Sequence, residues 1–130
     1  MKTYSKTLLR CSALFALIGA ILGSHMAGSG GYAFRSVHAH ILVVGWLTLF
    51  AWSIYYKLYT PVNKLLAALH VWTGIIGAFG LTIGMWLYYV KPFDLSQTLT
   101  TILFIVGGTI LLISFVIFFL LTFMRTEEDN

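Results

Sequence analysis

The chain has 130 residues, of which 59% are hydrophobic and only 9% are charged, and its formal net charge is +4. A soluble domain carries about 25% charged residues, so this composition excludes an ordinary soluble domain and indicates an integral membrane protein. Lysine and arginine stand singly between apolar runs, which gives no basic patch of the kind that binds nucleic acid. The single cysteine, Cys11, excludes an intrachain disulfide and a CxxCH site for covalent haem.

Four stretches of the chain are long and apolar enough to cross a membrane, since a span needs about 20 mostly apolar residues. They cover about residues 6–26, 36–56, 64–89 and 99–124. The first follows basic residues like a secretory signal, but no A-x-A cleavage site comes after it, so we expect a membrane helix. The connecting loops are too short for a second domain. The sequence therefore predicts one all-α domain over 1–130, a bundle of four transmembrane helices.

The ends of the predicted helices differ in charge. Arg35 and Lys91 fall at one set of ends, and the other set carries Lys2, Lys6, Arg10, Lys57, Lys64 and Arg125. The positive-inside rule then predicts that both termini lie in the cytoplasm, with the bundle in a bacterial inner membrane. Pro61 suits the first turn of the third helix. Two tyrosine and tryptophan groups suit aromatic belts at the two membrane surfaces: Tyr55, Tyr56 and Tyr59, and Trp86, Tyr88 and Tyr89.

Glycines recur at spacings of three and four in two of the predicted helices. They are Gly19 and Gly23 in the first, and Gly74, Gly77, Gly80 and Gly84 in the third. Such strips let another helix approach closely, so they predict tight packing and self-association. The four acidic residues all fall in loops or in the C-terminal tail. A proton-coupled transporter usually needs an ionisable group at membrane depth, so the small drug exporters that use an intramembrane glutamate are disfavoured.

The four histidines are the candidates for chemistry inside the membrane. At about 1.5 Å of rise per residue, His25 lies about 22 Å above Arg10, and His40 about 25 Å above Lys57. His38 is slightly higher, whereas His70 is only about 9 Å above the basic end of its helix. We therefore expect His25, His38 and His40 in one outer layer. His70 is about 15 Å too low to share an iron with His40 in the same chain.

His38 and His40 form an H-x-H motif at the mouth of the second predicted helix. Two residues along a helix correspond to about 200° of rotation, so the two side chains point to opposite sides. The motif therefore offers one ligand to each of two sites rather than two ligands to one metal. The alternative is that both histidines bond to lipid headgroups and loop carbonyls at the interface. For His70 alone, a structural role is favoured over a metal-binding one.

The stretch "SVHAHILVVGWLTLFAWSIYYKLY" resembles the catalytic subunit of the haem–copper oxidase and nitric oxide reductase superfamily. It resembles still more the small four-helix proteins related to it, which carry an HAH-x-x-x-x-G-W signature. That signature is here His38, Ala39, His40, Gly45 and Trp46. The stretch "LLAALHVWTGIIGAFGLTIGMWL", with His70, is similar to the next helix of those small proteins.

This resemblance implies that the chain is one four-helix arc of an oxidase subunit I. Copies of it, three in the twelve-helix arrangement, surround b-type haems that His38 and His40 ligate. His25 is a further possible ligand to iron or copper, and Arg35, one turn outside His38, is placed to pair with haem propionates. The chain departs from the oxidases, because Leu42 and Val44 follow the two histidines by four residues and no H-x-x-x-Y or paired-histidine copper motif is present. Proton-pumping oxygen reduction is therefore not expected.

The sequence thus predicts a homo-oligomeric membrane protein that binds haem b non-covalently. It transfers electrons, or binds or reduces a small gas such as oxygen or nitric oxide, with a quinol or a cytochrome as possible electron donor. An iron with two histidine ligands is blocked and suits an electron carrier, whereas an open iron site allows gas chemistry and oxidoreductase activity. The alternatives are a non-catalytic assembly module of the membrane, and a copper-binding protein that uses the outer-layer histidines.

Overall fold

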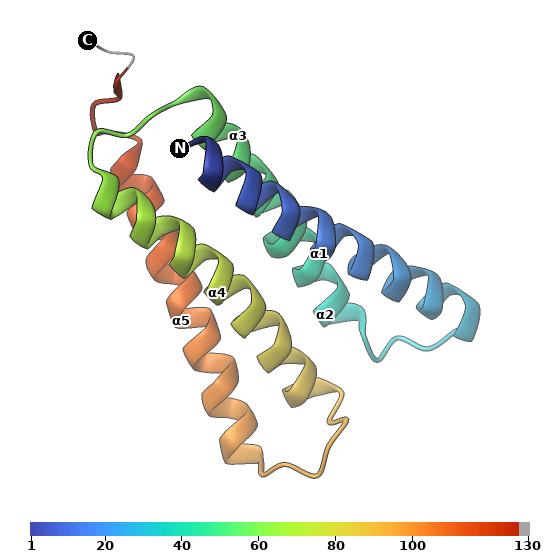
Figure 1. The fold of residues 1–130 in the computed structure, drawn as a ribbon. Helices are drawn as coiled ribbons and strands as arrows, with labels where there is room; N and C mark the ends of the chain where they lie inside the picture. The colour runs from blue at the N-terminus through green and yellow to red at the C-terminus, as the bar shows by residue number, and fades with distance from the viewer. Residues whose placement is uncertain (128–130) are drawn as a thin grey trace.

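In the computed structural model, which describes residues 1–127, the chain forms a series of helices joined by short loops (Figure 1). They are α1 (Lys2–Ser29), α2 (Arg35–His40), η1 (Ile41–Thr48), α3 (Leu49–Leu58), α4 (Lys64–Tyr89) and α5 (Gln97–Leu121). The segments α2, η1 and α3 follow one another without a break and make one rod. The described residues therefore hold four rods, each long and apolar enough to cross a membrane, as predicted.

Helix α1 is longer at both ends than the sequence predicted. It already begins at Lys2, and it ends where Gly30 adopts a left-handed conformation with φ 67°. The N–H of Gly30 donates to the carbonyl of Met26 at 3.0 Å. Glycine pays no steric cost for this conformation, which makes it the usual residue for ending a helix.

The position of Pro61 differs from the prediction. The side chain of Asn63 caps α4 by accepting a hydrogen bond from the N–H of Leu66 at 3.0 Å, so Pro61 lies before the helix and not in its first turn. The residue after Pro61, Val62, instead donates its N–H to the carbonyl of Arg125 at 3.3 Å. Helix α5 begins at Gln97, two residues earlier than predicted, and ends three residues earlier than predicted, at Leu121.

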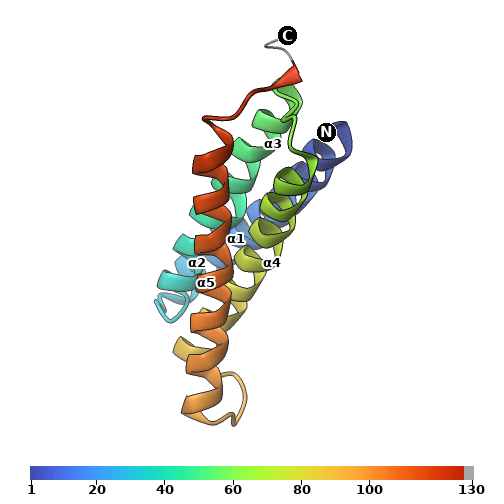
Figure 2. The same cartoon turned by 90° about the vertical axis from the view of Figure 1, so that its left-hand side faces the viewer.

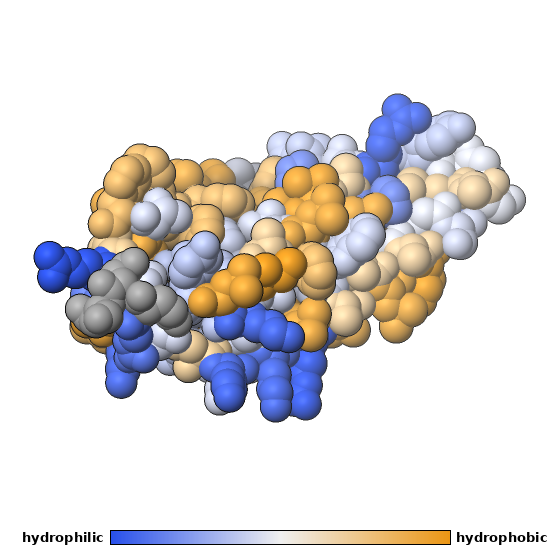
Figure 3. Space-filling model, turned by 90° about the horizontal axis from the view of Figure 1, so that it is seen from above, coloured by the Kyte–Doolittle hydropathy of each residue, from blue (hydrophilic) through white to orange (hydrophobic). Residues whose placement is uncertain are grey.

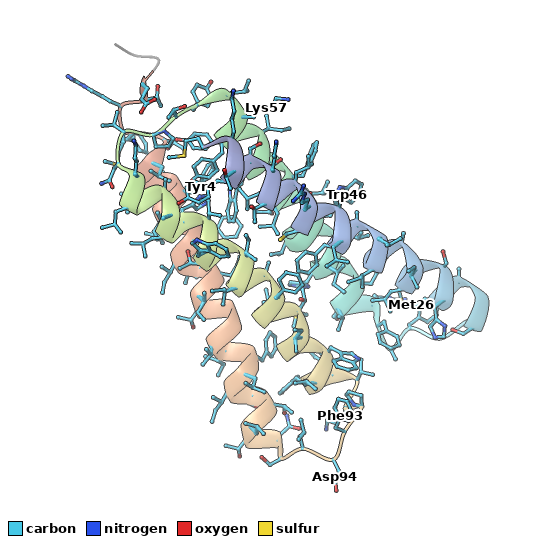
Figure 4. All side chains as sticks on the ribbon, in the orientation of Figure 1. Tyr4, Met26, Trp46, Lys57, Phe93 and Asp94 are labelled. Atoms are coloured by element: carbon cyan, nitrogen blue, oxygen red, sulfur yellow. The ribbon has the colours of Figure 1, made fainter. Side chains whose placement is uncertain are left out.

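The helices form two antiparallel pairs. Helix α1 lies along the rod of α2, η1 and α3, and α4 lies along α5 (Figures 1 and 2). The start of α1 and the end of α5 lie at the same end of the molecule, here called the terminal end, and the two pairs diverge towards the other end, here called the far end (Figure 1). Figure 4 shows Tyr4 and Lys57 near the terminal end, and Met26, Phe93 and Asp94 near the tips of the two pairs at the far end.

The glycines of α4 pack inside the chain. A methyl group built on Gly84 lies 2.7 Å from the Cα of Phe104, and one built on Gly74 lies 2.7 Å from the ring of Trp52. Gly80 and Gly77 likewise face the backbone of α5. The predicted tight packing is confirmed, because these glycines let α4 and α5 touch backbone to backbone. The glycines of α4 therefore pack against other helices of the same chain.

The basic residues divide between the two ends as the sequence suggested. Lys2 and Lys6 lie in the first turns of α1, Lys57 in the last turn of α3, and Lys64 in the first turn of α4. All of these turns lie at the terminal end. Figure 3, which views the molecule from that end, shows strongly hydrophilic side chains beside hydrophobic flanks. The opposite end carries Arg35 at the start of α2 and, after α4, Lys91.

Candidate functional site

His38 lies on α2 and turns towards α1. A methyl group built on Gly23 of α1 lies 2.9 Å from Cε1 of the His38 ring and 3.5 Å from its Nε2. The half-buried ring thus fits only because position 23 has no side chain. Its Nδ1 atom is buried and has no hydrogen-bond partner among residues 1–127. A buried polar atom without a partner costs about 1–3 kcal/mol, so this nitrogen is an unsatisfied group in the interior of the described chain.

The ring of His40 is fixed by a different interaction. Its Nδ1 atom lies 2.9 Å from the carbonyl oxygen of Ser36, one turn earlier in α2. A carbonyl oxygen only accepts, so Nδ1 is the protonated nitrogen and Nε2 carries the lone pair. A metal-binding histidine almost always donates its second N–H to a carboxylate or a backbone carbonyl in this way. No residue in the described range bonds to Nε2 of His40, which is therefore free to act as a ligand.

His38 and His40 point to different sides of their helix. Residues 35–40 are α-helical, so the rotation of about 200° expected between them holds in the structure. One ring packs on α1 and the other does not. The two imidazoles therefore do not converge on one metal within the chain. The two rings therefore point to different sides, as their spacing of two residues predicts.

His25 and Arg35 lie at the same end as the H-x-H motif, but neither touches it. The exposed ring of His25 makes an edge contact with the ring of Phe34, with 6.1 Å between centroids. The exposed guanidinium of Arg35 lies 4.5 Å above the ring of Tyr32, a cation–π contact. No carboxylate of the described chain pairs with Arg35, so the cation is free to meet an anionic group from outside.

His70 is enclosed in the core, away from the other histidines. Its side chain is 0% exposed, and its Nδ1 atom lies 2.8 Å from the hydroxyl of Tyr56. That hydroxyl also lies 3.2 Å from the carbonyl of Ala67, and the backbone carbonyl of His70 accepts a hydrogen bond from Ser114 at 2.9 Å. The ring of Trp52 meets the His70 ring edge to face at 4.4 Å between centroids.

This cluster corrects the prediction for Tyr56. The sequence suggested an aromatic belt residue at the membrane surface, yet Tyr56 is only 1% exposed and its ring contacts that of Tyr4 from α1. The hydroxyl finds partners on α4, which allows the ring to be buried. Tyr56 and His70 thus join α3 to α4. The sequence favoured such a structural role for His70 over a metal-binding one. Hydropathy alone does not distinguish an interfacial tyrosine from one that turns inwards.

A π-helix, η1, directly follows the H-x-H motif, and no sequence pattern pointed to it. It covers Ile41–Thr48, and the hydroxyl of Thr48 donates to the carbonyl of Val43 five residues earlier, at 2.9 Å. In its middle, Gly45 lies directly against the ring of Phe15 in α1. π-helical segments are rare and occur frequently at functional sites. Here the wider turn sets the rotation of α2, and hence of both histidines, relative to α3.

The comparisons with known proteins add no family. No family model, no curated protein and no solved structure matches the chain. Within residues 1–127, no three His, Cys, Asp or Glu side chains come together in a way that could hold a metal ion. A copper centre with three such ligands therefore needs residues from more than one copy. The site consists of His38 and His40, with Arg35 nearby.

Proposed function

We propose that this chain binds haem b non-covalently in the membrane, with His38 and His40 as axial ligands to two different haems that lie between copies of the chain. The observation that carries the proposal is the hydrogen bond from Nδ1 of His40 to the carbonyl of Ser36, which leaves Nε2 as an oriented, partnerless ligand atom. His38 points to the other side of the helix and its Nδ1 atom has no hydrogen-bond partner among residues 1–127, but the ring packs against Gly23 of α1, so it must turn away from α1 to hold a haem between copies. The exposed Arg35 is available for haem propionates.

The bound haem supplies one-electron chemistry and, with an open iron site, binding or reduction of oxygen or nitric oxide. The chain's own residues hold and orient the group. The carbonyl of Ser36 fixes the orientation of the His40 ring and the tautomer that leaves Nε2 as the ligand atom. The apolar helix surfaces exclude water, and no carboxylate lies within the described spans to deliver protons. Electron transfer therefore suits the site better than proton-consuming chemistry.

The proposal includes a topology and an assembly. The excess of basic residues at the terminal end favours both termini in the cytoplasm of a bacterial cell, with the histidines near the outer face. Because His38 and His40 point to different sides, a closed ring in which each haem lies between neighbours uses both residues of every copy. Three copies give twelve helices and three haems. A quinol or a cytochrome is the proposed electron donor.

The first test is an optical spectrum of the detergent-purified protein, oxidised and then reduced with dithionite. We expect a Soret band and sharp α bands when reduced, with one haem per chain by metal analysis. His38→Ala and His40→Ala each lose these bands, whereas His25→Ala, at an exposed position of the same layer, keeps them. A shift on adding carbon monoxide indicates an open iron site. A colourless protein that takes up no added haem refutes the proposal.

A mixing experiment tests whether the haem lies between copies. His38→Ala and His40→Ala chains are co-expressed with different affinity tags, and mixed rings are purified through both tags. In such a ring, His40 of a His38→Ala chain can lie opposite His38 of a neighbouring His40→Ala chain. We expect these mixed rings to recover part of the haem that each variant lacks alone. If both ligands of a haem come from the same chain, mixing restores nothing.

The main alternative function is a non-catalytic assembly module that packs on a partner protein. The glycines of α4 do not support it. The glycines of α4 that suggested a partner surface are covered by α5 and by Trp52 of the same chain. The histidines therefore remain the best guide to function.

A further inference from the structure

An apolar groove opens between the two helix pairs at the far end. Its volume is about 470 Å³. Helix α1 lines it with Phe15, Ile18 and Leu22, and α4 lines it with residues from Phe79 to Trp86. The one hydroxyl in the lining, that of Thr82, already donates to the carbonyl of Ala78 at 2.8 Å. Val37 and Ile41, which flank the H-x-H motif, complete the lining, so the groove borders the candidate site but offers no free hydroxyl and no metal ligand.

The groove runs along the helices. Its lining residues run from Phe15 to Leu22 on α1 and from Phe79 to Trp86 on α4, seven steps on each helix, which is about 10 Å at about 1.5 Å per residue. On α1 it begins near the middle of the helix, at Phe15, and it ends at Trp86 and Phe34, near the far end. The groove therefore runs along the direction of an acyl chain and covers about two thirds of the roughly 15 Å depth of one leaflet.

Two cations lie next to the lining of the groove in the sequence and are called its rim here. Arg35 directly follows Phe34, and Lys91 lies five residues after Trp86, where it lines a separate hollow together with Asp94. Both cations are exposed, and within residues 1–127 no carboxylate forms an ion pair with either. Lysine and arginine at a membrane surface attract anionic lipid headgroups. Apolar walls and a cationic rim together match the two parts of an anionic phospholipid.

We propose that this groove binds one anionic phospholipid, with an acyl chain between α1 and α4 and the phosphate at Arg35 and Lys91. The lipid fills the space where the two helix pairs diverge and holds them at a fixed angle next to the H-x-H motif. This inference shares Arg35 with the proposed haem site, whereas Lys91 and the apolar walls of the groove belong to the lipid site alone, so variants of these residues test it separately from haem binding.

Native mass spectrometry of the delipidated full-length protein tests the proposal. The probes are phosphatidylglycerol and phosphatidylcholine with identical acyl chains. We expect one phosphatidylglycerol to remain bound under conditions that remove phosphatidylcholine. Ile18→Trp and Ile83→Trp fill the groove and reduce this retention at least tenfold. Ile113→Trp, at a similarly exposed position of α5 outside the groove, leaves it unchanged.

Charge variants test the rim independently. Arg35→Gln and Lys91→Gln each reduce the retention of phosphatidylglycerol about fivefold, and neither changes the retention of phosphatidylcholine. Lys57→Gln, at the terminal end, has no effect. These substitutions leave the groove walls unaltered, so this comparison decides the question even if a tryptophan variant does not fold. Equal retention of the two lipids, or equal loss in all variants including Ile113→Trp, refutes a specific site. Loss of a dimer instead of a lipid in Ile83→Trp identifies a second copy as the occupant and also refutes it.

Discussion

The hydrogen bond between Tyr56 and His70 provides the sharpest test of the fold, because both side chains are buried and they join the two helix pairs. Tyr56→Phe removes the hydroxyl and leaves the His70 ring with no partner for either nitrogen. Nε2 already lacks one among residues 1–127. An unsatisfied buried group costs about 1–3 kcal/mol, whereas side-chain hydrogen bonds in membrane proteins average about 0.6 kcal/mol and reach about 1.7 kcal/mol. We therefore expect Tyr56→Phe to lower the free energy of unfolding by about 1 kcal/mol.

A double-mutant cycle separates this bond from general packing. His70→Leu removes the other partner, and in Tyr56→Phe/His70→Leu neither polar group remains to be left unsatisfied. Replacing both partners by apolar groups is nearly neutral for the bond itself. We therefore expect the double variant to be about 1 kcal/mol more stable than the sum of the two single effects predicts. Unfolding by sodium dodecyl sulfate in mixed micelles, followed by circular dichroism, measures all four proteins.

The control pairs Tyr56→Phe with Thr82→Val. Thr82 lies twelve residues after His70 on α4, about 18 Å away, and its hydroxyl bonds only to backbone of its own helix. Distant substitutions of this kind add within about 0.3–0.5 kcal/mol. If the Tyr56 and His70 effects also add within that margin, the hydrogen bond does not join the pairs and the reasoning fails.

Two further predictions concern stability. Gly84→Val places its Cβ against the backbone at Phe104, so it forces α4 and α5 apart and lowers the free energy of unfolding by about 1–3 kcal/mol. The control is Gly28→Val, where no atom lies within 4 Å of the added Cβ, and it costs less than about 1 kcal/mol in the same unfolding assay. Asn63→Ala removes the cap on the N–H of Leu66 and costs about 1 kcal/mol, whereas Asn63→Asp keeps it; equal stability of these two variants contradicts the capping assignment.

The sequence predicted the spans well because each depends on local quantities. Length and hydropathy located the four helices to within a few residues. The helix ends that differ from the prediction are set by capping interactions, which hydropathy does not reveal. Ser96 caps α5 by accepting the N–H of Leu99 at 3.2 Å, which places the start at Gln97. The π-helix at Ile41–Thr48 was not predictable from hydropathy, since it changes which carbonyl each N–H reaches and leaves the composition of the span unaltered.

For the candidate site, the sequence predicted what depends on helix rotation and missed what depends on tertiary packing. The opposite directions of His38 and His40 follow from a spacing of two residues. That Gly23 admits the ring of His38 depends on how α1 crosses α2, and only the structure reveals it. The burial of Tyr56 likewise depends on His70, fourteen residues away on another helix. The haem, copper and oligomer predictions stay predictions.

The two ends of the molecule differ in how the helix pairs are joined, and this difference indicates where a ligand or a partner has most influence. At the terminal end, Tyr56 bonds to His70, and the N–H of Glu127 donates to the carbonyl of Thr60 at 2.9 Å. At the far end, the described residues include no hydrogen bond between the pairs, which meet there through apolar contacts such as that of Phe15 with Phe79, 4.5 Å between centroids. A molecule that binds only the folded state stabilises it in proportion to its affinity. Lipid, haem or a second copy at the far end therefore adds the connection that the chain lacks there, whereas a ligand at the terminal end meets pairs that are already joined.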